Sequence, residues 1–356
     1  MKAIFSKNVI KPTFQFLFCL TVPILATTQT KQDYKTAVIA FYNCENFYDT
    51  LNDPLSRDDE FTVKGEKHYS SNIYFDKLEK IAGVISKIGT DASIKNPDGP
   101  AIMGLAEIEN KNVLNDLIAH PLLRNRKYDY VHFDSKDERG VDVALLYNPK
   151  YFKVEASKPL FVKMRGYYYT RDILWVKGSL DGETIHIYVN HWPSRIGGQE
   201  QTEASRMIAA HVLKNHMDSI LKADGSQKIV IMGDFNDDPE NKSISEILKA
   251  KEHEYNVSMF GLFNPFADLF KKGIGSILNR DVWSLFDQII ISYPWLNKKQ
   301  DGFFFYQSLI YNSAFLTENM GRYKGYPMRT WDGNTYRGGY SDHFPAYIVL
   351  LKAAHR

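Results

Sequence analysis

Short runs of β-branched and aromatic residues recur along the chain, and most of them are flanked by polar side chains. The seven runs are TAVIAFYN, PAIMGLAE, VDVALLYN, TIHIYVNHW, KIVIMGDFN, FDQIIIS and PAYIVLL, which begin at residues 36, 100, 141, 184, 228, 286 and 345. Each is short and has turn-like flanks, so each predicts a mostly buried strand. Asp, Asn, His or Glu at the end of a buried strand lies at a sheet edge, where a cleft can form. The pattern therefore predicts a strand-rich fold with a polar cleft at the strand ends.

A few helices are predicted between these strands. Apolar residues spaced i, i+3 and i+4 over residues 78–88 predict an amphipathic helix, with Gly89 at its C-terminal cap. A second helix is predicted near residues 200–221, and a short third over 243–249.

The remaining segments complete the predicted architecture. Residues 171–180 predict a strand that forms a hairpin, through Asp181-Gly182, with the run from residue 184. Residues 258–279 and 301–339 have no clean period, and we expect long loops there. Many strands with few helices favour an α/β fold of two packed sheets with helices outside.

The N-terminus has the features of a secretory signal peptide. Three lysines precede a 13-residue apolar run from Phe14 to Ala26, which is shorter than the ~20 residues of a membrane-spanning helix. We expect a signal peptide over residues 1–28, one domain over 33–356, and export to the periplasm or the medium. An uncleaved anchor is the alternative; a lipoprotein is disfavoured because bulky Phe18 precedes Cys19.

Composition excludes several classes of protein. The net charge is +2, from 44 basic and 42 acidic side chains, which argues against binding to nucleic acid through bulk charge. Cys19 and Cys44 are the two cysteines, so a disulfide framework, a zinc ribbon and an iron–sulfur cluster are excluded.

Two motifs at strand ends suggest hydrolytic chemistry. In GDFNDDP, Asp234 and Asn236 are two residues apart, so on an extended strand they point to the same side and could hold a water and a substrate oxygen. An Asx turn that ends the strand is the structural alternative. In SDHFP, Asp342 is adjacent to His343, and histidine carries protons near neutral pH. A surface turn is the alternative there.

Two further motifs add a metal ligand and phosphate contacts. In GLAEIEN, Glu107 follows an apolar run, and a carboxylate is a ligand that Mg²⁺ prefers. Glu109 has the same parity, so the spacing does not choose between them. In VNHWPSR, His191 is a candidate donor to the transition state, and Arg195 can pair with phosphate.

Weaker signals come from single residues. FYNCENF places Asn43 at the end of the first strand, with Asn46 as an alternative, and Asp287 starts a later strand. Arg139 is a candidate phosphate contact. Asp142 could be a functional acid or a solvated edge residue, and the sequence leaves this open.

In this order, the motifs resemble the endonuclease/exonuclease/phosphatase superfamily, the deoxyribonuclease I-like proteins. The resemblance extends from about residue 36 to 351, and it implies a four-layer α-β-β-α sandwich of two mixed sheets. It implies catalytic roles for five residues: His191, Asp234, Asn236, Asp287 and His343. It implies a Mg²⁺ site, with Mn²⁺ or Ca²⁺ as alternatives, at three residues: Asn43, Glu107 and Asp342.

The resemblance implies a secreted, Mg²⁺-dependent phosphodiesterase that acts by in-line attack of water. A monomeric nuclease is the first expectation. Phospholipid or sugar phosphate hydrolysis is the alternative, and an inactive binding module is a minor one. Arg139, Arg195, Arg206 and the tyrosines 167–169 could form a local groove for nucleic acid, although packing is the commoner role of such tyrosines. The aromatic run 303–306 could contact a membrane, but core packing is commoner.

Overall fold

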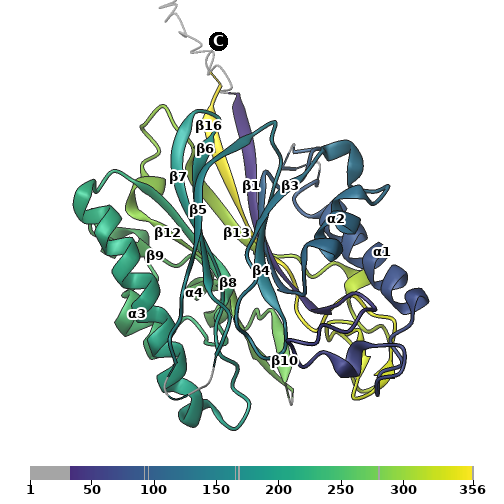
Figure 1. Cartoon of the computed structure of the whole chain (residues 1–356). Coiled ribbons are helices and arrows are strands. Elements are labelled where there is room, and N and C mark those ends of the chain that lie inside the picture. Colours follow the sequence, from purple (N-terminus) through teal and green to yellow (C-terminus); the bar gives the residue numbers. More distant parts are fainter. Residues whose placement is uncertain are drawn as a thin grey trace, which may run out of the picture. The chain divides into compact units, whose positions relative to one another are not determined.

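The seven apolar runs all form strands, and the strands divide between two six-stranded sheets (Figure 1). The first sheet has the order β13-β16-β1-β2-β4-β3 and the second β5-β6-β7-β8-β12-β9. In the first sheet the strands are β1 (Tyr34–Phe47), β2 (Ile102–Ile108), β3 (Asp129–His132), β4 (Asp142–Tyr147), β13 (Phe304–Ile310) and β16 (Ala346–Ala353). In the second they are β5 (Phe152–Leu160), β6 (Ile173–Leu180), β7 (Glu183–His191), β8 (Lys228–Asp234), β9 (Leu262–Phe263) and β12 (Asp287–Ser292).

This description comes from a computed structural model that covers residues 33–354, except 92, 95, 165, 167, 168 and 280. The signal peptide expected over residues 1–28 lies outside the described residues. The chain from Tyr34 onward forms one compact unit. Among the described residues, no helix combines the length and apolar character needed to cross a membrane.

Both sheets are mixed, and each contains one parallel pair. β1 runs parallel to β2, and β7 runs parallel to β8, whereas the other neighbouring strands are antiparallel. The hairpin of β6 and β7 pairs Leu180 with Glu183, as the Asp181-Gly182 turn predicts. Parallel neighbours end at the same edge of a sheet, so the polar ends of these strands gather at one end of the fold.

Three apolar cores define four layers. One core fills the space between the two sheets and includes Phe41 and Ile289. A second lies between the first sheet and helices α1 (Ser71–Lys87) and α2 (Lys111–Ala119), and a third lies between the second sheet and α3 (Gln199–Ala223) (Figure 1). The predicted α-β-β-α sandwich of two mixed sheets is confirmed.

The predicted helices form with small differences. The first begins earlier than the periodic residues, at Ser71, and Gly89 adopts the left-handed conformation (φ 67°) that a helix terminus favours. The third predicted helix is a π-helical turn over Ser243–Leu248. Short helices also lie at Asp59–Phe61, Arg124–Arg126, Glu254–Asn256, Phe266–Lys271 (α4), Tyr293–Leu296 and Ala314–Leu316.

The expectation of long loops was partly wrong. Residues 301–339 contain β13. In the aromatic run 303–306, Phe303, Phe304 and Phe305 are buried, whereas Tyr306 is 57% exposed. Residues 301–339 also contain the two-stranded pair β14 (Trp331–Asp332) and β15 (Thr335–Tyr336), and residues 258–279 contain β9, α4 and β10 (Ile277–Asn279), which pairs with β11 (Val282–Ser284).

Candidate active site

The polar strand ends meet in a cavity of about 290 Å³. Eight of the ten predicted site residues line it: Asn43, Glu107, Arg139, His191, Asp234, Asn236, Asp342 and His343. Seven further residues complete the lining: Glu45, Asn46, Ser194, Ile196, Arg329, Trp331 and Gly333. Groups that are up to 300 residues apart in sequence are therefore brought together by the order of the strands.

Strand register explains the centre of the site. His191 pairs with Asp234 across β7 and β8, and Asp234 pairs with Asp287 across β8 and β12. The three side chains thus lie in one row across the second sheet. Asp287 does not line the cavity, but it reaches the site through His343.

Asp287 and His343 form a buried ion pair. Asp287 Oδ2 lies 2.6 Å from His343 Nδ1, and the two residues are 0% and 6% exposed. Burial lowers the pKa of His343, but Asp287 and then Asp234 outweigh it and raise that pKa well above its usual value. Because Nδ1 faces Asp287, Nε2 is directed to the cavity, 3.8 Å from Asp234 Oδ2. His343 is thus held as an oriented cation at the cavity wall.

Asp234 is fixed by hydrogen bonds at both oxygens. Oδ2 accepts from Asn43 Nδ2 at 3.0 Å, and Oδ1 accepts from the backbone N–H of Asn236 at 2.9 Å. The second bond is the Asx turn considered as the structural alternative, so Asp234 both ends its strand and lines the cavity. Burial raises its pKa to about 6, although the His343 cation opposes the shift. A carboxylate with a pKa near neutrality can accept a proton from water.

Glu107 also lines the cavity, and its two carboxylate oxygens have different surroundings. Glu107 Oε2 accepts from the backbone N–H of Asn46 at 2.7 Å, while Oε1 lies 3.6 Å from Arg139 Nη2 and 3.8 Å from His191 Nε2. Burial, then Arg171 and Arg139, lower the pKa of His191 well below its usual value, so this imidazole is neutral. Glu109 instead accepts from the backbone of Asp49, away from the cavity, so the structure favours Glu107 over Glu109.

The guanidinium groups of Arg195 and Arg206 both contact other residues of the protein. Arg195 contacts the carbonyl of Asn236 and the side chains of Asp237, Asp238 and Asn241, and it does not line the cavity. Arg206 is fully buried, with Nε 2.7 Å from Asp237. The prediction that Arg206 forms part of a groove for nucleic acid is therefore wrong. Of the tyrosines 167–169, Tyr169 is described and is partly exposed, and 167 and 168 lie outside the described residues.

Arg329 is a cavity residue that the sequence analysis did not single out. It donates from Nη2 to Asp342 Oδ2 at 3.0 Å, and its side chain is half exposed. Trp331 follows it and is buried beside Glu45, whose carboxylate accepts the backbone N–H of Thr330. Arg329 and Trp331 lie in the segment 301–339, whose apolar residues follow no regular spacing, so no sequence pattern could have identified them.

Left-handed backbone accompanies the site side chains. Glu45, Asn46, Glu107 and Asn236 have φ between 49° and 59°, a region that is costly for residues other than glycine. The conformation turns backbone N–H groups onto the site, since Glu45 donates to Asn43 Oδ1 at 2.9 Å.

The residues present fit a divalent cation. Carboxylates of Glu107, Asp234 and Asp342 line one cavity, and such oxygens are the ligands of hard cations. Glu107 Oε1 is beyond hydrogen-bonding distance of both Arg139 and His191, so it is available for a cation. Asn43 is less available, because its amide is bonded at both ends. Asp234, Asp287 and His343 also place one ligand atom each within 4.8 Å of one another.

Fold and site together have the features of the phosphoesterase fold of the two-sheet α-β-β-α type. The model of the Endonuclease/Exonuclease/phosphatase family matches residues 38–352, and the chain belongs to this family. No curated protein matches the sequence.

Solved structures with the same fold have low sequence identity. An endonuclease/exonuclease/phosphatase family protein from Bacteroides thetaiotaomicron is 16% identical, with a TM-score of 0.53 over 92% of this chain and 100% of that one. A mannosyl-6-phosphatase of the same organism is 16% identical, with a TM-score of 0.52 over 88% and 99%. D. rerio TDP2, complexed with single-strand DNA product, is 13% identical, with a TM-score of 0.53 over 88% and 98%.

Proposed function

We propose that this protein is a divalent-metal-dependent phosphodiesterase that hydrolyses nucleic acid by in-line attack of water. One observation carries the proposal: the Asp287–His343 pair, at 2.6 Å, directs His343 Nε2 toward Asp234 in a cavity that Glu107 also lines. A base, an oriented cation and a carboxylate that can hold a metal are three groups that together can promote phosphodiester hydrolysis.

The chain's own residues would orient and move protons. Asp234 would accept the proton of the attacking water, while Asn236 would help to hold that water in line with the leaving group. His343 would donate a hydrogen bond from Nε2 to a phosphate oxygen. Arg139 and Arg329, which line the cavity, would contact the remaining phosphate oxygens.

A divalent cation would be held by Glu107, with Asp342 and Asn43 nearby. When bound, it would neutralise phosphate charge and favour departure of the leaving oxygen. Mg²⁺ is proposed first because the donors are oxygens, and Mn²⁺ or Ca²⁺ are the alternatives.

A neighbouring hollow supports a substrate larger than phosphate. It measures about 400 Å³, shares Arg329 and Asp342 with the cavity, and is lined by Tyr323, Tyr326 and Arg337 among others. Tyrosine faces and an arginine can stack with a base or pair with a second phosphate. D. rerio TDP2, which has this fold, binds a single-strand DNA product in its solved complex, and this agrees with a nucleic acid substrate here.

Sugar phosphate hydrolysis is a second candidate. The small size of the cavity, about 290 Å³, favours it, as does the mannosyl-6-phosphatase that shares this fold. We also propose that the protein is exported and that it is a monomer. N-terminal sequencing of protein recovered outside the cytoplasm would test export, and the mass of the protein in solution would test the monomeric state.

A substrate panel tests the proposal. The purified protein, with Mg²⁺ or with EDTA, is assayed on bis-(p-nitrophenyl) phosphate, p-nitrophenyl phosphate, single- and double-stranded DNA, RNA and mannose 6-phosphate. The proposal expects Mg²⁺-dependent cleavage of the diester and of nucleic acid. His343→Ala should remove activity, whereas His211→Ala, at an exposed histidine on α3, should not. Activity on monoesters alone would favour the sugar phosphatase, and no hydrolysis with any divalent metal would refute both.

A further inference from the structure

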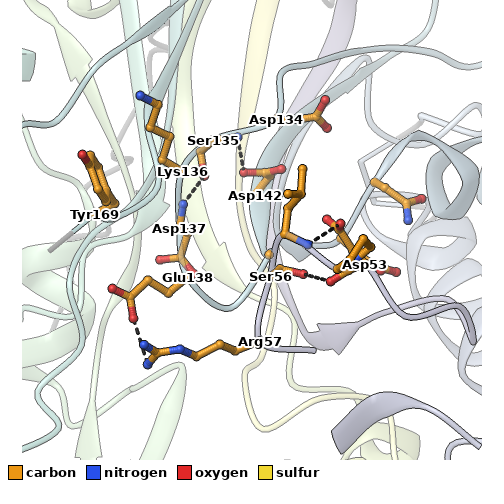
Figure 2. A pocket seen from close by; sticks show the side chains of 15 residues that line it. Asp53, Ser56, Arg57, Asp134, Ser135, Lys136, Asp137, Glu138, Asp142 and Tyr169 are labelled. Carbon is orange, nitrogen blue, oxygen red and sulfur yellow. Dashed lines mark hydrogen bonds and ion pairs between the residues drawn. The ribbon is translucent and has the colours of Figure 1, made fainter. Parts of the chain in front are cut away.

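A second hollow, of about 730 Å³, lies beside the connection between β3 and β4 (Figure 2). It shares no lining residue with the candidate active site. Six of its lining residues are acidic: Asp53, Glu109, Asp134, Asp137, Glu138 and Asp142. Carboxylates in such numbers are common on protein surfaces, so they do not by themselves indicate a ligand.

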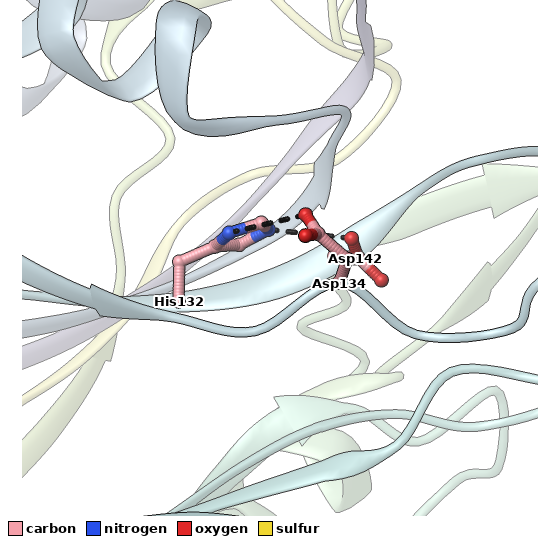
Figure 3. Close-up of side chains that lie close together, drawn as sticks. All are labelled: His132, Asp134 and Asp142. Carbon is pink, nitrogen blue, oxygen red and sulfur yellow. Dashed lines mark ion pairs between the residues drawn. The ribbon is translucent and has the colours of Figure 1, made fainter. Parts of the chain in front are cut away.

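His132 does not line the hollow, but it lies beside two carboxylates that do, those of Asp134 and Asp142. Its side chain is 0% exposed, and neither ring nitrogen makes a hydrogen bond within the described part of the chain. Instead, Nε2 lies 3.3 Å from Asp142 Oδ2 and Nδ1 lies 3.8 Å from Asp134 Oδ1, with both carboxylates turned toward the ring (Figure 3). A buried imidazole without hydrogen bonds, facing two carboxylates, is costly unless something else satisfies it.

We propose that His132, Asp134 and Asp142 bind a divalent transition metal ion of the zinc class. Two donors at ~2.0–2.1 Å from a tetrahedral Zn²⁺ are ~3.3–3.4 Å apart, which matches the separation of His132 Nε2 and Asp142 Oδ2. One ligand atom from each of the three residues lies within 4.8 Å of the others. The imidazole donor distinguishes this site from an all-oxygen site for Mg²⁺ or Ca²⁺.

The surroundings orient two of the three ligands. His132 pairs with Ala144 across β3 and β4, so His132 and Asp142, two residues before Ala144, lie on the same face of the sheet. The backbone N–H of Ser135 donates to Asp142 Oδ1 at 2.9 Å, which leaves Oδ2 facing the imidazole (Figure 2). Asp134 is 76% exposed at its side chain and can turn to complete the site.

The proposed ion would join the two ends of a functional loop. Residues 133–141 connect β3 to β4 and carry Arg139, which donates to Asn46 Oδ1 at 2.5 Å in the candidate active site. An ion held at both ends of this loop would restrict its motion. This inference does not depend on the proposed function, because its measurements are of metal binding and proteolysis.

Zinc titration is the test. The purified protein, stripped with a chelator, is titrated with Zn²⁺ in excess Mg²⁺, by calorimetry and against a chromophoric chelator. We expect one Zn²⁺ per chain, with affinity at least 10-fold weaker in Asp134→Asn and in His132→Ala. Glu138→Gln, at an acidic residue of the same hollow, and His343→Ala, in the other histidine cluster, should retain that binding.

Four results would overturn the inference. They are absence of tight Zn²⁺ binding, an equal loss in Glu138→Gln, a loss confined to His343→Ala, and displacement of Zn²⁺ by equimolar Ca²⁺. Asp134→Asn keeps the test decisive if His132→Ala fails to fold, because Asp134 is exposed. As a second measurement, Zn²⁺ should slow tryptic cleavage after Lys136 several-fold in the parent and not in Asp134→Asn; equal protection of both would contradict the site.

Discussion

Replacing Asp287 with Asn tests how His343, the proposed catalytic histidine, is held. In the parent, Asp287 Oδ2 and His343 Nδ1 are 2.6 Å apart in a buried setting. At an effective dielectric constant of about 20, the gross attraction of such a pair is about 6 kcal/mol, most of which offsets the cost of burying the two charges. Breaking a buried pair typically costs about 3–5 kcal/mol, and the retained amide reduces this, so we expect destabilisation by about 2–3 kcal/mol.

The expected effect on activity is larger than the effect on folding. Asp287→Asn removes the charge that keeps His343 protonated and in one orientation, so the imidazolium that is proposed to act at the phosphate is lost at neutral pH. We expect kcat to fall by about 10²- to 10⁴-fold, or roughly 3–5 kcal/mol in the barrier. The assay is steady-state hydrolysis of bis-(p-nitrophenyl) phosphate with Mg²⁺, combined with thermal melting.

A pH series separates orientation from mere loss of structure. Without Asp287, the pKa of His343 should fall, so residual activity should increase as the pH is lowered toward about 6, where the histidine regains its proton. Below that pH, protonation of Asp234, whose pKa is about 6, should remove the base and lower the activity again. Asp218→Asn, which removes a carboxylate paired with Lys214 on the surface of α3, serves as the matched control and should change neither rate nor pH profile. The reasoning is refuted if Asp287→Asn melts near the parent temperature and retains parental kcat, because the pair would then contribute neither stability nor orientation.

Three other changes have distinct expected outcomes. Asp234→Asn should lower kcat by about 10²-fold or more, because the amide cannot accept a proton from water. Its melting temperature at pH 8 should stay close to that of the parent: the amide avoids burial of the carboxylate, whose pKa burial raises to about 6, but its single oxygen keeps only one of the two hydrogen bonds that Asp234 accepts. Unfolding instead of inactivation would assign Asp234 a structural role. Arg329→Ala should raise KM about 10-fold through loss of a charged contact, and an unchanged KM would remove it from the substrate site. Burial, then Lys158, lower the pKa of His216 to about 4, so the folded state disfavours its protonation. The stability that the neutral His216 contributes is therefore fully present above pH ~6.5 and is lost as the pH falls toward 4. We expect this loss to be about 1 kcal/mol in the free energy of unfolding, after allowance for the partial exposure of the side chain. Denaturant unfolding at the two pH values should detect it, and His216→Gln should abolish it.

The strands that carry the site could be predicted because both of their faces are buried. Such strands read as continuous apolar runs, and their polar ends mark the sheet edge where the cavity forms. β3 and β5 were not predicted. β5 is an edge strand that contains Pro159 and in which only the terminal residues Phe152 and Leu160 are buried, so its sequence differs little from that of a loop.

Arg329 and Trp331 could not be predicted for another reason. They reach the cavity from a segment whose position is set by tertiary contacts, such as the hydrogen bonds from the backbone of Thr330 and Trp331 to Glu45. Arg195 shows the opposite case: its motif predicts a phosphate contact, but neighbouring carboxylates occupy its guanidinium. A sequence motif gives the chemistry that a residue can perform, whereas the contacts decide whether that chemistry is available.

Strained backbone and catalytic geometry have a common origin in this fold. Of the four cavity residues with left-handed backbone, Glu45, Asn46 and Asn236 each donate their backbone N–H to a side chain of the site. A left-handed residue other than glycine costs roughly 1 kcal/mol or more, so it persists only where the surrounding structure fixes it. Buried apolar neighbours fix these positions: Cys44, Phe47 and Ile108 pack in the core between the first sheet and α1 and α2, and Phe235 packs in the core between the second sheet and α3. The site is therefore held in place before any substrate arrives, because the same burial that stabilises the strands also offsets the strain that orients Glu107 and Asp234.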